Sequence, residues 1–168
     1  MKTVLPFSGM SQYDDSVAPE LRSSACGPVT AHLLLKHAGL PAYSVDELYQ
    51  SLRGTRIGLF TFRFVKFLNK LLPSDWRAEK CTLQEALKEI KKGRPVAVKF
   101  DKYFSFQFRS ETSFAYHWVP MTGFVVDEGK LFLLVHDNGG RGRESKLRRI
   151  PYGPNHKIVT FVKIAPLQ

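Results

Sequence analysis

The sequence of 168 residues contains only two cysteines, Cys26 and Cys81, and they lie far apart. Neither belongs to a CxxC pair or to a group of histidines with the spacing of metal ligands. The sequence therefore predicts no zinc site, no disulfide framework and no metal or organic cofactor, although a single bridge between the two cysteines stays open. Internal repeats and low-complexity runs are also missing. At this length we expect one domain over residues 1–168.

Long hydrophobic runs are absent as well. The first nine residues lack the apolar stretch of about 7–15 residues found in a signal peptide, and no segment approaches the roughly 20 apolar residues that cross a membrane. As the sequence is written, we expect a cytoplasmic protein with no membrane span. Export of a processed form stays open.

Acidic residues are scarce, with 15 Asp and Glu against 25 Lys and Arg, which gives a net charge of +10. Such a balance favours acidic partners. The charges are dispersed, however, and the densest group, at residues 141–149, has no interleaved aromatic residues on which bases could stack. We therefore expect a solvated basic loop there, with a polyanion contact as the alternative, and no nucleic-acid partner. The sequence indicates no oligomeric state.

Helical patterns occupy the first part of the chain and strand patterns the second. After an extended lead-in at residues 1–25, apolar periodicity and capping residues predict helices at about 28–38, 44–53, 61–72 and 82–92. A period of two then predicts strands at about 95–100, 114–126, 130–136 and 157–164, with an aromatic-rich segment at 103–108. Helices followed by an antiparallel sheet indicate an α+β fold.

Cys26 stands where the lead-in turns into the first helix. A helix N-terminus carries roughly half a positive elementary charge and unpaired N–H groups, and both favour a thiolate over a thiol. The position is therefore typical of an activated sulfur. The alternative is a small buried cysteine that only packs.

A nucleophilic cysteine needs a base within hydrogen-bond reach, and five histidines are available. His37 lies on the same helix about 16 Å along its axis, which is too far. His32 points to another side of that helix, and His156 lies in a turn-like stretch. His117 and His136 remain, each on a predicted strand.

The strand after His117 ends in Asp137, which could orient its imidazole. A hairpin with a three-residue loop near residue 127 would place Asp137 opposite His117 on the same face. A two-residue turn at Glu128 and Gly129 would instead place Asp137 opposite Pro120. Because strand alternation sends His136 to the other face, we predict His117 as the base.

An oxyanion hole requires donors aimed at the oxygen of the attacked carbonyl. The backbone N–H of Cys26 is one candidate. Gln12 is the only Gln or Asn that precedes this cysteine, and its amide is a candidate for the second donor.

In this order, Gln12, the Cys26-Gly27-Pro28 start of an apolar helix, His117 and Asp137 resemble the C39-like peptidases of the papain-like cysteine peptidase superfamily. The resemblance spans nearly the whole chain. It implies a papain-like fold, in which N-terminal helices pack on a C-terminal antiparallel sheet and the active site lies in the cleft between them. It also implies that Cys26 is the nucleophile, His117 the general base and acid, Asp137 the orienting carboxylate and Gln12 the oxyanion donor.

The sequence departs from the family pattern at two points. Asn138 follows Asp137 where a proline is common, and the interval from Gln12 to Cys26 is longer than in the bacteriocin-leader peptidases. No transporter is attached, so we do not expect the double-glycine leader specificity of those enzymes.

These residues predict a cysteine peptidase or related amide hydrolase that acts on a peptide or protein through an acyl-enzyme thioester. Two alternatives stay open. The first is acyl transfer of the transglutaminase-like or peptidoglycan-amidase kind, and the second is a non-catalytic module that binds a peptide or a polyanion. A group of aromatic residues either lines an apolar cleft or packs in the core; it comprises Phe104, Phe106, Phe108, Phe114, Tyr116 and Trp118.

Overall fold

The structure is a computed structural model that describes residues 1–41, 43–102 and 116–168. The aromatic-rich segment expected at 103–108, and the beginning of the strand expected from residue 114, lie outside the described residues. In the described ranges, no helix has the length and apolar character needed to cross a membrane.

The four predicted helices are confirmed. In chain order the helical elements are η1 (Arg22–Ser24), α1 (Cys26–His37), α2 (Val45–Ser51), α3 (Thr61–Leu71), α4 (Leu83–Lys91) and α5 (Tyr152–Asn155). Both capping boxes form, because the hydroxyls of Ser44 and Thr82 accept from backbone N–H groups of Glu47 and Glu85, whose carboxylates accept in return. The first helix begins two residues earlier than expected, at Cys26 itself.

The strands form one seven-stranded antiparallel sheet in the order β2-β7-β3-β4-β5-β6, and β1 pairs with the free part of β4. Their bounds are β1 (Lys2–Val4), β2 (Trp76–Cys81), β3 (Val96–Asp101), β4 (Tyr116–Asp127), β5 (Lys130–His136), β6 (Leu147–Pro151) and β7 (Val159–Pro166). The α+β fold class is confirmed.

Three of these strands were not predicted. β1 belongs to the expected loop-rich lead-in, and β6 takes the end of the basic segment that was expected to be a solvated loop. β2 and β6 are the outer strands of the sheet, and most of their residues are charged or exposed. Charged edge strands resist pairing with other chains, but they lack the apolar alternation that identifies a strand in a sequence.

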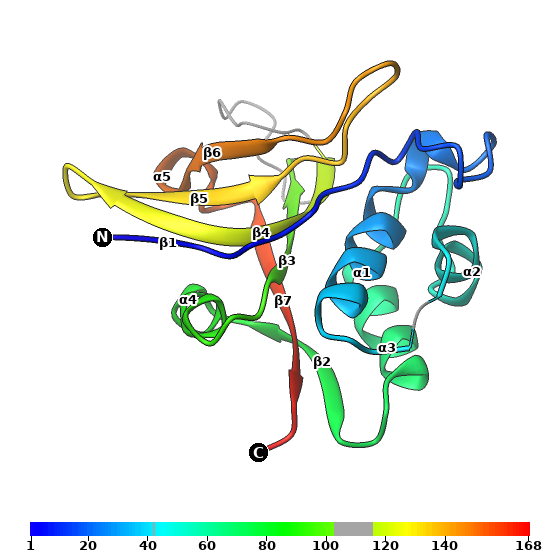
Figure 1. The fold of residues 1–168 in the computed structure, drawn as a ribbon, viewed down its shortest axis with the longest axis horizontal. Coiled ribbons are helices and arrows are strands. Elements are labelled where there is room, and N and C mark those ends of the chain that lie inside the picture. Colours follow the sequence, from blue (N-terminus) through cyan, green and yellow to red (C-terminus); the bar gives the residue numbers. More distant parts are fainter. Residues whose placement is uncertain (42, 103–115) are drawn as a thin grey trace.

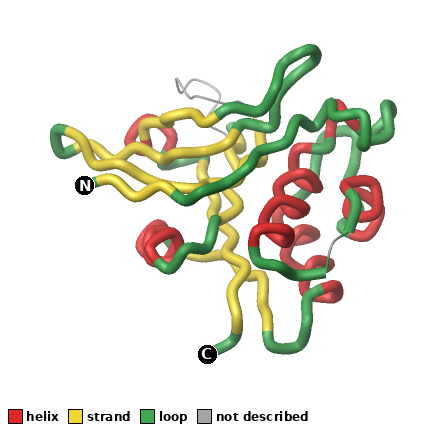
Figure 2. The backbone as a smooth tube through the Cα atoms, in the orientation of Figure 1, coloured by secondary structure: helices red, strands yellow, loops and turns green. Residues whose placement is uncertain are grey.

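Helices cover the two faces of the sheet unequally. Figure 1 shows α1, α2 and α3 grouped beside β3 and β7, with α4 on the other side of these strands, and Figure 2 shows the same separation of helices from strands. Between α1, α3 and the sheet, Phe64 stacks on Trp118 with ring centroids 4.6 Å apart. A second core cluster, under α4, includes Val98, Val119 and Phe161.

The hairpin between β4 and β5 does not have the three-residue loop considered from the sequence. Asp127 pairs with Lys130, so the loop is the two-residue turn Glu128-Gly129, and both residues have positive φ, 47° and 73°. Such angles at both central positions are typical of a type I′ turn, which matches the twist of the flanking strands.

A β-bulge then changes the register of this hairpin. The pairing shifts between Gly123 and Met121, and Met121 lies opposite Val135. One extra residue on β4 reverses the parity of the faces beyond it. Continued two residues past Val135, this register sets Asp137 across from Val119, on the same face as His117. With the bulge, His117 and Asp137 therefore lie on the same face of the sheet, whereas a two-residue turn without a bulge would place them on opposite faces.

Replacing Glu128 by asparagine should stabilise the fold. Asn tolerates left-handed backbone angles better than Glu, so Glu128→Asn should raise the free energy of unfolding by about 0.5 kcal/mol, measured by urea denaturation. The control is Glu20→Asn, which removes the same charge from an exposed residue without positive φ. An equal gain in both variants would show that charge, rather than turn strain, is responsible.

Candidate active site

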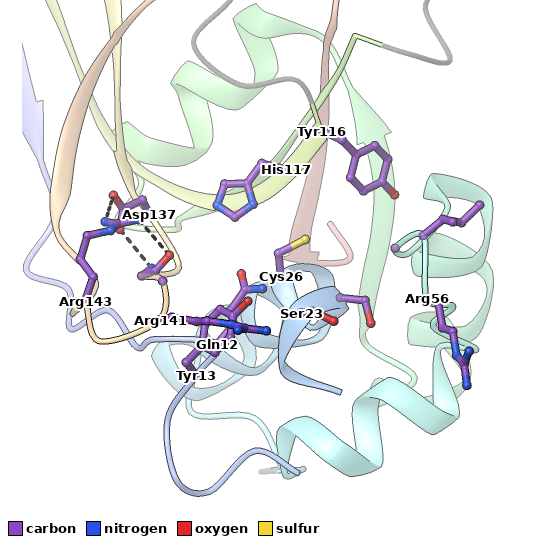
Figure 3. Close-up of a pocket in the computed structure, with 15 residues that line it drawn as sticks. Gln12, Tyr13, Ser23, Cys26, Arg56, Tyr116, His117, Asp137, Arg141 and Arg143 are labelled. Atoms are coloured by element: carbon purple, nitrogen blue, oxygen red, sulfur yellow. Dashed lines mark hydrogen bonds and ion pairs between the residues drawn. The ribbon is translucent and has the colours of Figure 1, made fainter. Parts of the chain in front are cut away.

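One cleft of about 410 Å³ contains all four residues singled out from the sequence. Gln12 comes from the N-terminal segment, Cys26 from the start of α1, His117 from β4 and Asp137 from the loop after β5. Figure 3 shows these side chains around a common space, with Cys26 between His117 and Gln12. The fold thus brings together four groups that are spread over 126 positions of the sequence.

The start of α1 is packed closely against the loop that precedes α3. A Cβ atom on Gly27 would lie 2.8 Å from the Cβ of Leu59 and 3.3 Å from the Trp118 ring, so only glycine fits without displacing its neighbours. Pro28 lies in the first helical turn, where its missing N–H leaves no helix bond unmade. Ala25, at the N-cap, has no side-chain acceptor. The first N–H groups of α1 are therefore left for the site.

Burial raises the pKa of the Cys26 thiol above its usual value. The backbone N–H groups of Trp118, Gly27 and Cys26 itself act in the opposite direction, as does the positive charge of Lys99. The helix terminus favours the thiolate as expected, but desolvation outweighs this effect. The pKa of Cys26 is therefore raised, whereas the helix terminus alone would lower it. The contact with the Trp118 N–H also places the sulfur next to the residue that follows His117.

Lys99 is a buried cation that the sequence analysis missed. Only 5% of its surface is exposed, and its Nζ lies 3.3 Å from Oδ2 of Asp101 and 5.0 Å from the centre of the Tyr116 ring. Burial lowers the pKa of Lys99, whereas Asp101 and the nearby sulfur raise it. The available signal was a lysine inside a strand already predicted to be buried, where charge is rare unless paired.

His117 is the histidine that lines the cleft, and its pKa is lowered to about 4. Burial is the largest cause, opposed by the negative charge of Asp137 and reinforced by the positive charges of Arg148 and Arg143. The imidazole is therefore neutral near pH 7. The other four histidines contact groups outside the cleft: His32 the carbonyl of Tyr43, His37 that of Gly93, His156 that of Gly153 and His136 the ring of Phe7.

Asp137 is 1% exposed and ionised. Burial pushes the pKa of this carboxyl upward, but its hydrogen bonds outweigh burial and hold the pKa below its ordinary value. Nη1 of Arg143 lies 2.9 Å from Oδ2, and the backbone N–H groups of Gly139 and Lys146 donate to Oδ1 at 3.1 and 3.3 Å. Part of the basic segment is therefore not a free loop, because Arg143 binds this carboxylate (Figure 3).

Gln12 is held in place at both its backbone and its side chain. Its backbone N–H donates to the carbonyl oxygen of Asn138 at 2.9 Å, and its Nε2 donates to the carbonyl oxygen of Arg22 at 2.7 Å. An amide nitrogen carries two hydrogens, so the second N–H remains for a ligand in the cleft.

Asn138, the residue that replaces the family's proline, links α1 to β4. Its buried Nδ2 lies 2.6 Å from the carbonyl oxygen of Trp118, 3.0 Å from that of Cys26 and 3.2 Å from Oγ1 of Thr30. These contacts could not be predicted from the sequence, because they join three segments that are distant along the chain. A proline at this position would supply none of these contacts.

Both cysteines are free, so the bridge left open by the sequence is excluded. Burial, with the nearby charge of Glu85, raises the pKa of Cys81 to about 12, which makes it a poor nucleophile. Within the described ranges, no group of three His, Cys, Asp or Glu side chains has an arrangement that could hold a metal ion.

Comparison with protein families agrees with this geometry. The model of the Peptidase_C39 like family matches residues 4–162. The chain belongs to this family. No curated protein sequence matches this C39-like family member.

Solved structures share the fold of this C39-like family member. The peptidase domain of Streptococcus ComA, a bi-functional ABC transporter involved in a quorum-sensing pathway, is 14% identical, with a TM-score of 0.61 over 96% of this chain and 99% of that one. A Bacillus anthracis protein assigned to the C39-like peptidases is 15% identical, with a TM-score of 0.63 over 97% and 98%. The Carica candamarcensis cysteine protease CMS1MS2, in complex with E-64, is 14% identical, with a TM-score of 0.63 over 99% and 95%. The papain-like fold is thus confirmed.

Removing the Asn138 amide should loosen the start of α1. Asn138→Ala leaves three buried acceptors with fewer donors and should lower the free energy of unfolding by about 2–3 kcal/mol, measured by urea denaturation. It should also speed alkylation of Cys26, because a helix start that is no longer fixed against β4 exposes a sulfur whose pKa is raised by burial.

The matched control is Asn155→Ala, which removes another fully buried amide, whose Nδ2 donates to the carbonyl oxygen of Pro151. It should destabilise the protein while leaving the alkylation kinetics of Cys26 unchanged. Identical alkylation kinetics in the two variants would contradict the bridging role of Asn138.

Proposed function

We propose that this protein is a cysteine peptidase that hydrolyses a peptide bond in a peptide or protein substrate, with Cys26 as nucleophile. The observation that carries the proposal is the convergence of Cys26, His117, Asp137 and Gln12 on one cleft. The family and the fold support it, because both are those of cysteine peptidases.

In the resting site the thiol and the imidazole are both uncharged, since burial raises the pKa of Cys26 and lowers that of His117. As the sulfur attacks the substrate carbonyl carbon, a ring nitrogen of His117 takes the thiol proton and the S–C bond forms. The negative charge that develops on the carbonyl oxygen accepts hydrogen bonds from the Gln12 side chain and the Cys26 backbone N–H.

Collapse of this intermediate breaks the C–N bond, and protonated His117 gives its proton to the leaving amine. The product is a thioester between Cys26 and the acyl part of the substrate. A water molecule then attacks the thioester while His117 takes one of its protons. The S–C bond breaks, the carboxylic acid leaves, and the proton returns to the sulfur.

Asp137 serves as the orienting carboxylate in this proposal. It remains ionised because Arg143 and two backbone N–H groups bind it, so it stabilises the imidazolium that forms during attack. Transglutaminase-like or amidase chemistry would use the same first half of the reaction and differ in the acceptor or the amide that is cleaved. A non-catalytic binding module would form no thioester.

Loss of the sulfur should abolish the reaction. We expect Cys26→Ala to lower kcat/KM on any cleaved peptide by about 10³-fold or more, measured by proteomic cleavage profiling followed by kinetics on the best peptide. Cys81→Ala is the control and should retain activity, because Cys81 lies outside the cleft. Cleavage by purified Cys26→Ala that falls by less than about tenfold would reject the proposal. Diversion of the acyl group to added amines in the intact protein would indicate acyl transfer.

The fall of kcat/KM at acidic pH should follow the protonation of His117. The base must be neutral, and its pKa of about 4 lets kcat/KM for an uncharged peptide persist to lower pH than a histidine with an ordinary pKa near ~6.5 would allow. Arg143→Gln removes a charge that lowers this pKa, so the acidic limb should move to higher pH.

The control for this shift is Arg149→Gln. Arg149 is paired with Asp127 at 2.7 Å and does not line the cleft. Its replacement should leave the limb in place. A limb that stays fixed in Arg143→Gln, or that moves to lower pH, would contradict the assignment of His117 as the base.

A further inference from the structure

Among the described residues, the cleft is lined by three arginines, Arg56, Arg141 and Arg143, and by one carboxylate, that of Asp137. Arg143 and Asp137 form an ion pair at 2.9 Å and largely cancel. His117 adds no positive charge near pH 7, because its pKa is lowered to about 4. Lys99, which also acts on the sulfur, is paired with Asp101 at 3.3 Å. Among the described residues that line the cleft, the uncompensated charge is therefore that of Arg56 and Arg141.

These two arginines have no carboxylate partner in the part of the chain that the structure describes. Three described carboxylates are close in sequence to residues that line the cleft, but none pairs with these arginines. Asp14 accepts from Ser16 in its own turn, Asp15 lies 3.8 Å from Arg22, and Glu144 does not line the cleft. Elsewhere in the described ranges, arginines with such partners are common, as Arg94 with Glu89 shows.

Each of the two arginines stands on a tight turn closed by backbone bonds. The turn 55–58 is closed by reciprocal bonds of 3.0 and 2.9 Å between Thr55 and Gly58, and the turn 140–143 by bonds of 3.0 and 3.1 Å between Gly140 and Arg143. In both turns the second residue is an arginine that lines the cleft. Short closed turns limit the backbone freedom beneath these side chains.

The two turns lie on opposite sides of the sulfur. Figure 3 shows Arg56 on the side of Cys26 away from Asp137, with its guanidinium group extended away from the sulfur, and Arg141 beside Gln12. Both positions are fixed by the site itself. A Cβ atom on Gly58 would lie 2.4 Å from the Tyr116 ring, and the second turn begins three residues after Asp137. A peptide seated over Cys26 would therefore pass one arginine in each direction, and Arg56, which is exposed, can turn its guanidinium group toward it.

We propose that the substrate is an acidic peptide segment, with Asp or Glu side chains on both sides of the cleaved bond that bind Arg56 and Arg141. This inference rests on the proposed function and names its substrate class. A guanidinium group matches a carboxylate with two parallel hydrogen bonds, and a cleft with one sign of charge attracts the opposite sign from a distance. The net charge of +10 acts in the same direction.

The first test measures binding apart from cleavage. Fluorescence anisotropy with full-length Cys26→Ala would compare three peptide libraries of equal length, rich in Glu, Gln or Lys. We expect the Glu library to bind more tightly than the Gln library by about tenfold, and the Lys library to bind most weakly. Equal binding of the Glu and Gln libraries would overturn the inference.

The second test reverses the charge of the two turns. In the Cys26→Ala background, Arg56→Glu with Arg141→Glu should abolish the preference for Glu peptides and favour Lys peptides. The matched control is Arg77→Glu with Lys80→Glu, which changes the net charge equally on β2, away from the cleft. It should keep the Glu preference, and loss of that preference in both double variants would show that only net charge matters and would overturn the inference.

The outcomes separate the two proposals. If the intact protein cleaves no peptide and forms no acyl-enzyme, the peptidase proposal fails, and the binding measurements on Cys26→Ala still decide the inference. If peptides are cleaved without regard to acidic residues near the cleaved bond, the peptidase proposal stands and the acidic substrate class is rejected.

Discussion

The contact on which the rest of the site depends is the one that Asn138 makes with two carbonyl oxygens from different layers of the fold. Its amide donates to Cys26 on α1 and to Trp118 on β4, so the helix that carries Cys26 and the strand that carries His117 are joined by one side chain. The backbone of Asn138 also accepts from the N–H of Gln12. Because the amide hydrogens face three acceptors, the amide has one favourable orientation, although its Oδ1 is left without a partner within the described ranges. The position of Asn138, directly after Asp137, therefore couples all four site residues.

The sheet brings His117 and Asp137 to the same face through a β-bulge in β4. A regular hairpin closed by the turn Glu128-Gly129 would set Asp137 and His117 on opposite faces, and the bulge between Met121 and Gly123 corrects the parity. Such a bulge also strengthens the local twist of β4. β4 can carry it because β3 pairs with one part of this long strand and β1 with the other, which leaves the ladder supported on both sides of the bulge.

Features that depend on local chemistry could be predicted from the sequence. Capping boxes at Ser44 and Thr82 and the change of period identified the helices and the main strands, and the family resemblance gave the fold. Features that depend on pairing between distant segments could not. The strand register that sets the position of Asp137 depends on a β-bulge, and no residue type in the sequence indicates this bulge. The contacts of Asn138 form only when three segments that are distant in the sequence come together. The edge strands β2 and β6 have the charged composition that is typical of loops.

Burial and charge are balanced differently at each group of the site, and this difference sets the state in which it rests. Asp137 stays ionised because Arg143 and two N–H groups offset its desolvation. At Cys26 and His117 the favourable interactions with nearby charges and N–H groups are too weak to offset desolvation. Desolvation therefore keeps the sulfur protonated and the imidazole neutral. In the proposed mechanism, charge separation between them is then unfavourable until a substrate carbonyl oxygen takes up the developing negative charge. The proposed oxyanion donors would therefore do more than stabilise an intermediate, because they would supply the stabilisation without which the proton stays on the sulfur.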